Sequence, residues 1–240
     1  MTDMTDTLLR QYPVLTLTPA DSNEKIRRTA FDFVHDVGYM VFASTALDGK
    51  TPTARGLEVH YLDGDHNLYL GIAKGKPCYL EWRKYPYLTG VIIRDTVRRL
   101  SVSVRISAHL TEIDPARQPE IYEKYWQLNP GTRALYRKDL SMFRIFLLDR
   151  GEGEVFHLPA DDEVRRVRFS FGQQAVRPWA YEIDSGRCVG CGMCAQACME
   201  DVIAPDEKGL YRINHFGCLE CGRCYMNCPN GAIRQRCGQE

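Results

Sequence analysis

The sequence predicts a mainly β protein (α+β) in two parts, a small closed β-barrel followed by a small cysteine-rich domain. Short segments between residues 39 and 158 alternate apolar and polar side chains and are separated by turn signals, a pattern typical of antiparallel barrels. Nine of the ten cysteines lie between Cys188 and Cys237, and only Cys78 lies outside that segment. A length of 240 residues is enough for one larger domain and one small one.

Three segments follow from this division. Residues 1–164 are expected to form the barrel domain and residues 184–240 the cysteine-rich domain. Residues 165–183 link them and carry several aromatic side chains, which a free linker would lack. We therefore expect a linker that packs on the barrel.

Two helices can be placed by their start and stop signals. Asp21 and Glu24 have the spacing of a capping box, and Gly38 ends the helix that follows. Asp114 as N-cap and Pro115 at the first position predict a helix over 115–128. A short helix over 76–85 lies between them in the chain.

The strands are separated by glycine-containing turns. Asp48-Gly49 is a strong hairpin signal after the first strand, and Gly151-Glu152-Gly153 separates the last two. Strands are predicted over residues 39–45, 53–62, 67–73, 88–94, 100–113, 143–148 and 154–158. Six or more short strands with few helices favour a small closed barrel.

Composition excludes several classes of partner. The net charge is zero and no run of like charge indicates a nucleic-acid or membrane surface. The N-terminus is acidic and polar, unlike a signal peptide, and no apolar stretch approaches the roughly 18 residues of a membrane helix. We expect a cytoplasmic protein that binds neither nucleic acid nor membranes.

Two cysteine runs repeat the same spacing, C-x2-C-x2-C-x3-C, thirty residues apart. The first run contains Cys188, Cys191, Cys194 and Cys198, and the second contains Cys218, Cys221, Cys224 and Cys228, which is followed by Pro229. This is the spacing of bacterial ferredoxins with two [4Fe–4S] clusters. The alternative is a pair of zinc knuckles, but zinc prefers cysteine pairs, whereas each run presents three cysteines at two-residue gaps.

The fourth cysteine of each run belongs to the other cluster in this type of domain. The first cluster is therefore expected to take Cys188, Cys191, Cys194 and Cys228, and the second Cys218, Cys221, Cys224 and Cys198. Cys237 lies near the C-terminus and is interpreted as a spare thiol. Cys78 lies in a predicted helix and is interpreted as a small, half-buried residue.

Three segments of the barrel have a familiar order. They are Pro52-Thr-Ala-Arg55-Gly56-Leu57, Leu68-Tyr-Leu-Gly-Ile72-Ala-Lys74-Gly-Lys76-Pro77, and Tyr85-Pro86. The stretch from Tyr39 to about Leu158 resembles the split-barrel flavin-binding family typified by pyridoxamine 5′-phosphate oxidase. The resemblance implies a split β-barrel that binds FMN at the interface of a homodimer.

The resemblance also implies which residues contact FMN. In this family the arginine of the second strand and the lysine that opens the next helix contact the FMN phosphate and ring edge, which corresponds to Arg55, Lys74 and Lys76. The matching motifs add Gly56, Leu57 and Ile72 to the expected cofactor site. Ile72 stands where many relatives have threonine, so one hydroxyl contact is absent. Residues that bind pyridoxal phosphate are not recognisable.

The residues themselves support a phosphate site in part. A dianionic phosphate needs two or three cationic or N–H donors from adjacent elements, and Arg55, Lys74 and Lys76 could meet there. The alternative is that Arg55 is a salt-bridge partner at the barrel edge and the lysines are solvated. The catalytic residues are unknown, and His60, at the end of the second strand, is a weak candidate for a proton donor.

Clusters and flavin together favour a redox enzyme. Clusters transfer single electrons, whereas FMN accepts one or two. The leading hypothesis is an FMN-dependent reductase of a small organic substrate, fed through its clusters by ferredoxin or a similar low-potential donor. Exposed [4Fe–4S] clusters are generally sensitive to oxygen, which favours reductive, anaerobic chemistry. Two alternatives stay open. These are an electron carrier without a substrate of its own, and a redox- or ligand-sensing module.

Overall fold

The computed structural model describes residues 13–62, 66–96, 100–159 and 164–236, and two compact units can be distinguished in it. The barrel unit extends to Arg94 and adds Val102–Val155 and Arg168–Val176. The cysteine unit comprises Asp95–Ser101, Phe156–Val167 and the chain from Arg177 onward. The predicted domain boundaries stay predictions, and Cys237 lies outside the described residues.

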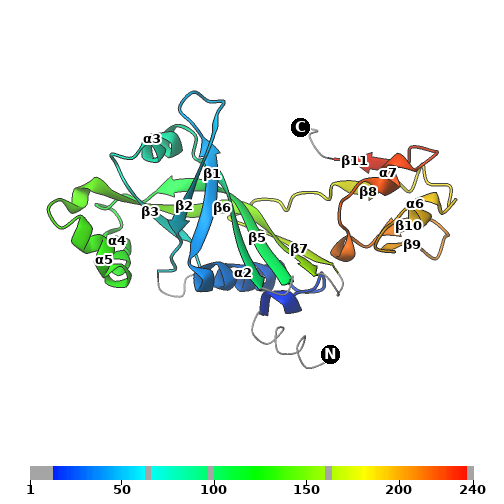
Figure 1. Ribbon diagram of the computed structural model, residues 1–240, viewed down its shortest axis with the longest axis horizontal. Helices are drawn as coiled ribbons and strands as arrows, with labels where there is room; N and C mark the ends of the chain where they lie inside the picture. The colour runs from blue at the N-terminus through cyan, green and yellow to red at the C-terminus, as the bar shows by residue number, and fades with distance from the viewer. Residues whose placement is uncertain (1–12, 63–65, 97–99, 160–163, 237–240) are drawn as a thin grey trace. The chain divides into compact units, whose positions relative to one another are not determined.

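The barrel is built on one antiparallel sheet (Figure 1). Its strands are β1 (Tyr39–Thr45), β2 (Pro52–Glu58), β3 (Tyr69–Ala73), β4 (Tyr87–Thr96), β5 (Leu100–Glu112), β6 (Phe143–Pro159) and β7 (Arg165–Phe171). The helical segments are η1 (Pro13–Thr16), α2 (Asn23–Val37), α3 (Pro77–Lys84), α4 (Pro119–Leu128), α5 (Pro130–Leu135) and η2 (Leu140–Met142).

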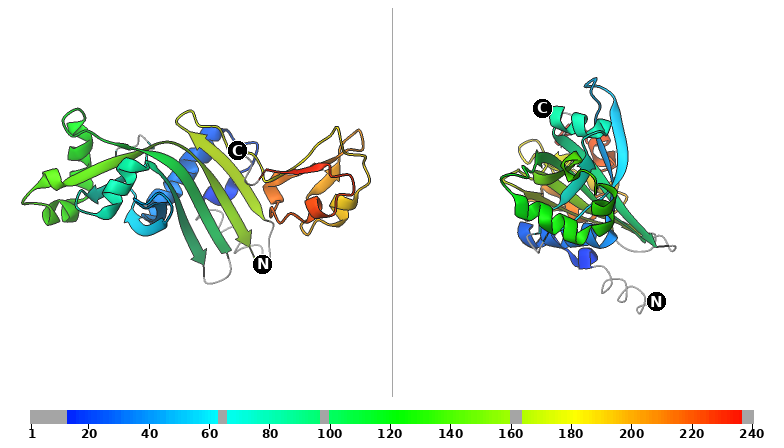
Figure 2. Two further views of the ribbon diagram at one scale, coloured as in Figure 1. Left: turned by 90° about the horizontal axis from the view of Figure 1, so that it is seen from above. Right: turned by 90° about the vertical axis from the view of Figure 1, so that its left-hand side faces the viewer.

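The strand order is β2-β1-β4-β5-β6-β3, with β7 paired to β6 as well. Figure 2 shows β5, β6 and β7 as long neighbouring strands of a strongly twisted sheet. The two ends of the order meet because His60, just after β2, forms an antiparallel bridge with Tyr69 of β3. This closure gives the split β-barrel, and the predicted fold class is confirmed.

Turn chemistry sets the first hairpin. β1 and β2 pair from Tyr39↔Glu58 to Thr45↔Pro52. In the loop between them, the carboxylate of Asp48 accepts hydrogen bonds from the backbone N–H groups of Lys50 and Thr51. Gly49 has a φ of 75°, which the turn requires and glycine adopts without strain.

Helix α2 supplies part of the barrel core. Its Phe31 is 1% exposed and makes edge-to-face contacts with Phe169 and Phe171 of β7. The two phenylalanines belong to the segment predicted as a linker, whose first seven residues therefore form strand β7. The helix ends at Gly38, which has a φ of 77° and donates its N–H to the carbonyl of Val34.

Three local predictions were wrong. The N-cap of α2 is Ser22, whose hydroxyl accepts from the Lys25 N–H, while the Asp21 carboxylate instead accepts from the Thr18 N–H. Helix α4 begins at Pro119, because Asp114 uses its carboxylate in a turn that accepts from the Ala116 N–H. The two strands expected on either side of residues 151–153 are one continuous strand, β6.

Strand β6 stays continuous because its glycines admit close neighbours. A Cβ on Gly151 would lie 2.3 Å from the Ser107 carbonyl oxygen, and one on Gly153 would lie 2.1 Å from the Phe169 ring. These glycines therefore serve packing rather than a turn. Helix α5 was not predicted at all.

The cysteine unit is small and has short elements. They are β8 (Tyr181–Ile183), α6 (Met193–Gln196), β9 (Ile203–Pro205), β10 (Tyr211–Ile213), η3 (His215–Gly217), α7 (Arg223–Met226) and β11 (Ile233–Gln235). β9 pairs with β10 and β8 pairs with β11, which gives two small antiparallel sheets. The first cysteine run connects β8 to β9 and the second connects β10 to β11, so each run joins one sheet to the other. Within the ranges described above, no helix is long and apolar enough to span a membrane.

Candidate functional sites

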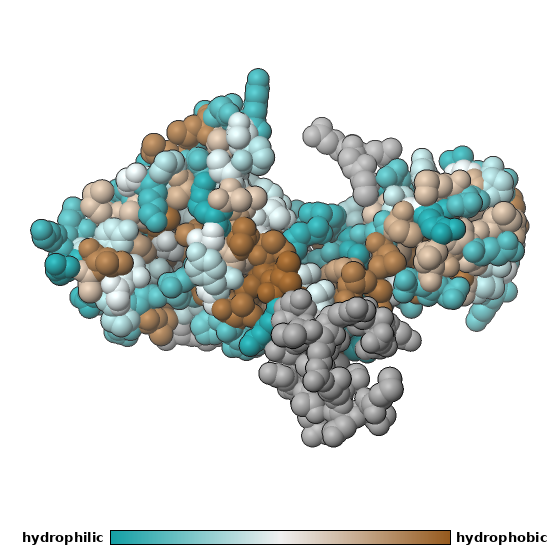
Figure 3. All heavy atoms as spheres, in the orientation of Figure 1, coloured by the Kyte–Doolittle hydropathy of each residue, from teal (hydrophilic) through white to brown (hydrophobic). Residues whose placement is uncertain are grey.

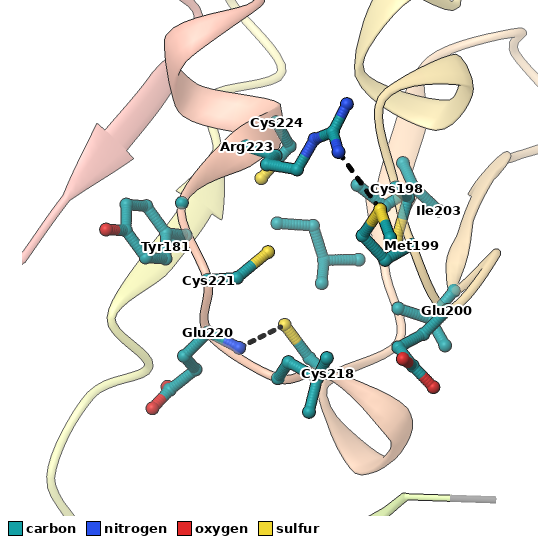
Figure 4. A pocket seen from close by; sticks show the side chains of 14 residues that line it. Tyr181, Cys198, Met199, Glu200, Ile203, Cys218, Glu220, Cys221, Arg223 and Cys224 are labelled. Atoms are coloured by element: carbon teal, nitrogen blue, oxygen red, sulfur yellow. Dashed lines mark hydrogen bonds between the residues drawn. The ribbon is translucent and has the colours of Figure 1, made fainter.

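Eight cysteines line two separate cavities of the cysteine unit. Cys188, Cys191, Cys194 and Cys228 line the first cavity. Cys198, Cys218, Cys221 and Cys224 line the second, which Figure 4 shows from close by. Each cavity thus draws three cysteines from one run and the fourth from the other. That these two sets hold iron in this grouping stays a prediction.

The backbone of both loops fits a sulfur-rich group. Gly190, Gly192 and Gly222 have φ values of 72°, 77° and 79°, which let the chain turn tightly around each cavity. Two N–H groups are directed at cysteine sulfurs, from Glu220 to Cys218 at 3.3 Å and from Ala232 to Cys228 at 3.2 Å. Such bonds stabilise thiolates that bind a cluster and influence its reduction potential.

Burial keeps several of these thiols protonated in the metal-free chain. It raises the pKa of Cys224 to about 11 and raises the pKa values of Cys194 and Cys218 as well. Because metal ligands must be thiolates, loading this domain releases protons.

In the barrel, Arg55, which is half-buried, forms an ion pair with the buried Glu81 of α3. Its Nη2 lies 2.8 Å from Glu81 Oε2 and 2.8 Å from the hydroxyl of Thr53. The Ser44 hydroxyl completes the network, since it donates to Glu81 and lies 3.3 Å from Arg55 Nη1. The side chain of Glu81 is only 6% exposed. Arg55 is therefore the salt-bridge partner that the alternative interpretation expects, and a role toward phosphate stays a proposal.

The pKa of Glu81 reflects two opposing effects. Burial raises the pKa, but hydrogen bonds from Arg55, Thr53 and Ser44, with the charge of Arg55, lower it below its ordinary value on balance. The carboxylate is thus ionised at neutral pH, and it holds the guanidinium of Arg55 in one place.

The two lysines lie in different surroundings. Lys76 is the N-cap of α3. Burial raises the pKa of Cys78, and the charges of Arg55 and Lys76 reduce this increase. Both cations are therefore within electrostatic range of Cys78. Lys74 lies beside η2, because its backbone N–H donates to the Met142 carbonyl oxygen at 2.8 Å.

The remaining residues of the expected cofactor site face different ways. A Cβ on Gly56 would lie 2.3 Å from the ring of Tyr39, so this glycine makes room for a tyrosine of the neighbouring strand. Leu57 is half-buried opposite Met40 in the register. Ile72 is 2% exposed, so its side chain belongs to the barrel core.

His60 closes the barrel through its backbone bridge with Tyr69. Burial lowers the pKa of its imidazole, although Glu58, 3.5 Å from Nε2, opposes this. The ring packs edge-on against Tyr125 at 5.3 Å. In this setting the imidazole packs against Tyr125, and its burial favours the neutral form.

Two residues near the sites were not found from sequence. Glu81 lies on the buried face of α3 with Cys78 and Trp82. The sequence signal for it was a carboxylate three residues after Cys78 and next to Trp82, at a position that a helix places on its apolar face. Glu220 takes the place in the second cysteine loop that Gly190 takes in the first. The alignment of the two repeats would have shown the difference.

Comparison with known proteins identifies the cysteine unit. Residues 187–233 match a family described as a 4Fe-4S dicluster domain. The chain is 37% identical over 51 residues to the pyruvate synthase subunit PorD of Methanocaldococcus jannaschii, covering 21% of this chain and 59% of that subunit. It is 37% identical over 60 residues to ferredoxin-1 of Rhodobacter capsulatus, covering 24% of this chain and 91% of that protein.

The C-terminal part is therefore an iron–sulfur, ferredoxin-like electron-transfer domain. Among solved structures, a NimC/NimA family protein of Clostridium acetobutylicum is similar, with a TM-score of 0.48 and 19% identity, and the match covers 60% of this chain and 92% of that one. The split-barrel fold itself is given by the strand order and the bridge that closes it.

Proposed function

We propose that the protein is an FMN-dependent reductase that receives electrons from ferredoxin or a similar low-potential donor through its ferredoxin-like domain. The observation that carries the proposal is the union, in one chain, of a dicluster domain and a split barrel with cations at the start of α3. When bound, the clusters supply single electrons and FMN converts them to two-electron reduction of a small organic substrate.

The FMN phosphate would be held at the start of α3. Lys76 supplies a cation at the N-cap and makes no side-chain capping bond, so its ammonium can turn to a ligand, while Pro77 has no N–H and the Tyr79 N–H donates to the Lys76 carbonyl oxygen. Arg55 would add a second cation whose position Glu81 fixes. With the Glu81 carboxylate included, the three side chains keep one net positive charge, which favours a phosphate over a neutral ligand.

Electron entry through a protein partner is supported by the surface of the ferredoxin-like domain. Cys191 and Cys221 are exposed. Large apolar side chains next to the two runs are exposed too, namely Val189, Met193, Met199, Tyr225 and Met226. An apolar surface around accessible ligands suits brief docking of another redox protein.

A homodimer is supported by an apolar sheet face. Tyr39 and Val41 of β1 and Val91 and Ile93 of β4 are exposed, with Val41 opposite Val91 in the register. Figure 3 shows hydrophobic side chains gathered over β4 beside β1. Exposed apolar faces of this kind commonly mark protein interfaces.

Anaerobic stopped-flow mixing with reduced ferredoxin tests the reductase. We expect the cluster absorbance to bleach first and the flavin absorbance to follow within the same single turnover, because the flavin is the two-electron acceptor. Protein stripped of FMN is the control and should show cluster bleaching alone. A bound flavin that never responds while the clusters are reduced would contradict the proposal.

A carrier without its own substrate is the second candidate. The exposure of Cys191 and Cys221 favours it, since accessible ligands also suit electron exchange between two protein partners. Turnover that requires a protein acceptor, and that no small organic acceptor supports, would favour the carrier.

A further inference from the structure

The two cysteine loops differ at one backbone position that requires a left-handed conformation. In the first loop Gly190 has a φ of 72°, and in the second Glu220 has a φ of 55°. The two positions are thirty residues apart and lie just before Cys191 and Cys221. A side chain is less favourable than glycine in this region, so a glutamate at this position suggests a task for its carboxylate.

Glu220 is held through both its carboxylate and its backbone. Its carboxylate accepts from the Ala180 N–H at 3.0 Å and lies 3.2 Å from Nη1 of Arg166. Its backbone N–H donates to Cys218 Sγ at 3.3 Å, a bond drawn in Figure 4, where the carboxylate points away from the centre of the cavity. The side chain thus fixes the backbone that donates to a cysteine of the second cavity.

Arg166 is a buried cation beside the same loop. It is 7% exposed, and its guanidinium lies 4.4 Å from the centre of the Phe156 ring. Its Nε donates to the carbonyl oxygen of Cys218 at 3.2 Å. All of these groups belong to the cysteine unit.

Buried charges act strongly on a nearby redox group because solvent and salt screen them little. Reduction of a cluster adds one negative charge, so a cation near it favours the reduced form and a carboxylate disfavours it. The residues around the second cavity fit a cluster, as its four cysteines and directed N–H group indicate.

We propose that Arg166 and Glu220 form a charge pair that sets the reduction potential of the second cluster separately from the first, Arg166 raising it and Glu220 lowering it. Both are positioning residues, since they act through the loop of Cys218 rather than as ligands. The inference concerns the ferredoxin-like domain and holds whether or not the barrel binds a flavin.

An EPR-monitored potentiometric titration of the full-length, cluster-loaded protein tests the pair. Glu220→Gln should raise the potential of one of the two clusters and Arg166→Gln should lower the potential of the same cluster. Each shift should reach about tenfold in the one-electron equilibrium, or about 59 mV. The double variant should lie between the two single variants, and the other cluster should stay unchanged in all three.

Glu200→Gln is the matched control, because Glu200 lines the second cavity but is not part of the Arg166 pair. It should shift the potential less than Glu220→Gln does. Shifts in the same direction in Glu220→Gln and Arg166→Gln, or equal shifts of both clusters, would overturn the proposal, because a purely structural role predicts them. If Glu220→Gln loses iron, Glu220→Gly takes its place, since glycine is the residue at the equivalent position of the first loop, Gly190. An unchanged potential in Glu220→Gly would also overturn the pair.

Discussion

Serine in place of Cys198 should remove the second cluster and leave the first intact, although Cys198 belongs to the first cysteine run. The reason is the arrangement of the cavities, since Cys198 lines the same cavity as Cys218, Cys221 and Cys224. The iron content of anaerobically purified protein should fall from about eight to about four per chain. Iron and sulfide assays measure the loss, and EPR of the reduced protein shows one remaining cluster.

Cys228→Ser is the reciprocal variant and should remove the first cluster, because Cys228 lines the cavity of Cys188, Cys191 and Cys194. The matched control is Cys78→Ser. Cys78 is 4% exposed on α3 and lines neither cysteine cavity, so the iron content should not change. Loss of the same cluster in Cys198→Ser as in Cys188→Ser would contradict the crossed arrangement.

Methionine in place of Arg55 should destabilise the barrel by about 3 kcal/mol at neutral pH, because it leaves a buried carboxylate without its cation. The hydroxyls of Ser44 and Thr53 still lie beside Glu81, which places the cost at the low end of the usual range. Denaturant unfolding followed by circular dichroism measures the change in the free energy of unfolding.

The stability lost in Arg55→Met should become smaller as pH falls. In the wild type the pKa of Glu81 is lowered by folding, so the pair stabilises above the unfolded value of 4.5 and loses this contribution as pH falls through the folded pKa. In Arg55→Met, burial acts without the guanidinium and favours the neutral acid. The difference in the free energy of unfolding between the two proteins should therefore begin to shrink above pH 4.5 and continue to shrink as pH falls through the lowered folded pKa of Glu81 in the wild type.

Arg83→Met is the matched control, on the helix that carries Glu81. Arg83 is an exposed arginine 3.6 Å from Glu112, and such pairs contribute about 0–1 kcal/mol. The additional change Glu81→Gln in Arg55→Met should recover part of the stability, since it removes the buried charge. A loss in Arg55→Met no larger than in Arg83→Met would show that the pair is not a structural element of the barrel.

The sequence predicted the strands well where turn chemistry and alternation agree. Asp48-Gly49 marks the β1–β2 hairpin correctly because its geometry is local. Gly151 and Gly153 were misread, because their role is to admit Ser107 and Phe169, which are distant in sequence. Asp114 likewise has the residue type of an N-cap, but it uses its carboxylate in a turn.

The cysteine site was predicted in more detail than the site around Arg55, because only the cysteine spacing is local in sequence. Cysteine spacing is a local signal, and it was sufficient to identify the dicluster domain. The partners of Arg55 and Cys218 come from distant parts of the chain, since Glu81 is 26 residues from Arg55 and Arg166 is 52 residues from Cys218. Only the fold brings these groups together, so no spacing rule could have found the pairings, although the helical spacing of Glu81 could have marked it as a buried carboxylate.

Cofactor stoichiometry is the most direct measurement of the central proposal. The protein would be purified anaerobically, its absorption spectrum recorded, and iron, sulfide and acid-extracted flavin determined per chain. We expect about eight irons and one FMN per chain, the content of two [4Fe–4S] clusters and one flavin site. About eight irons without flavin, even after incubation with added FMN, would contradict the reductase and leave an iron–sulfur electron carrier.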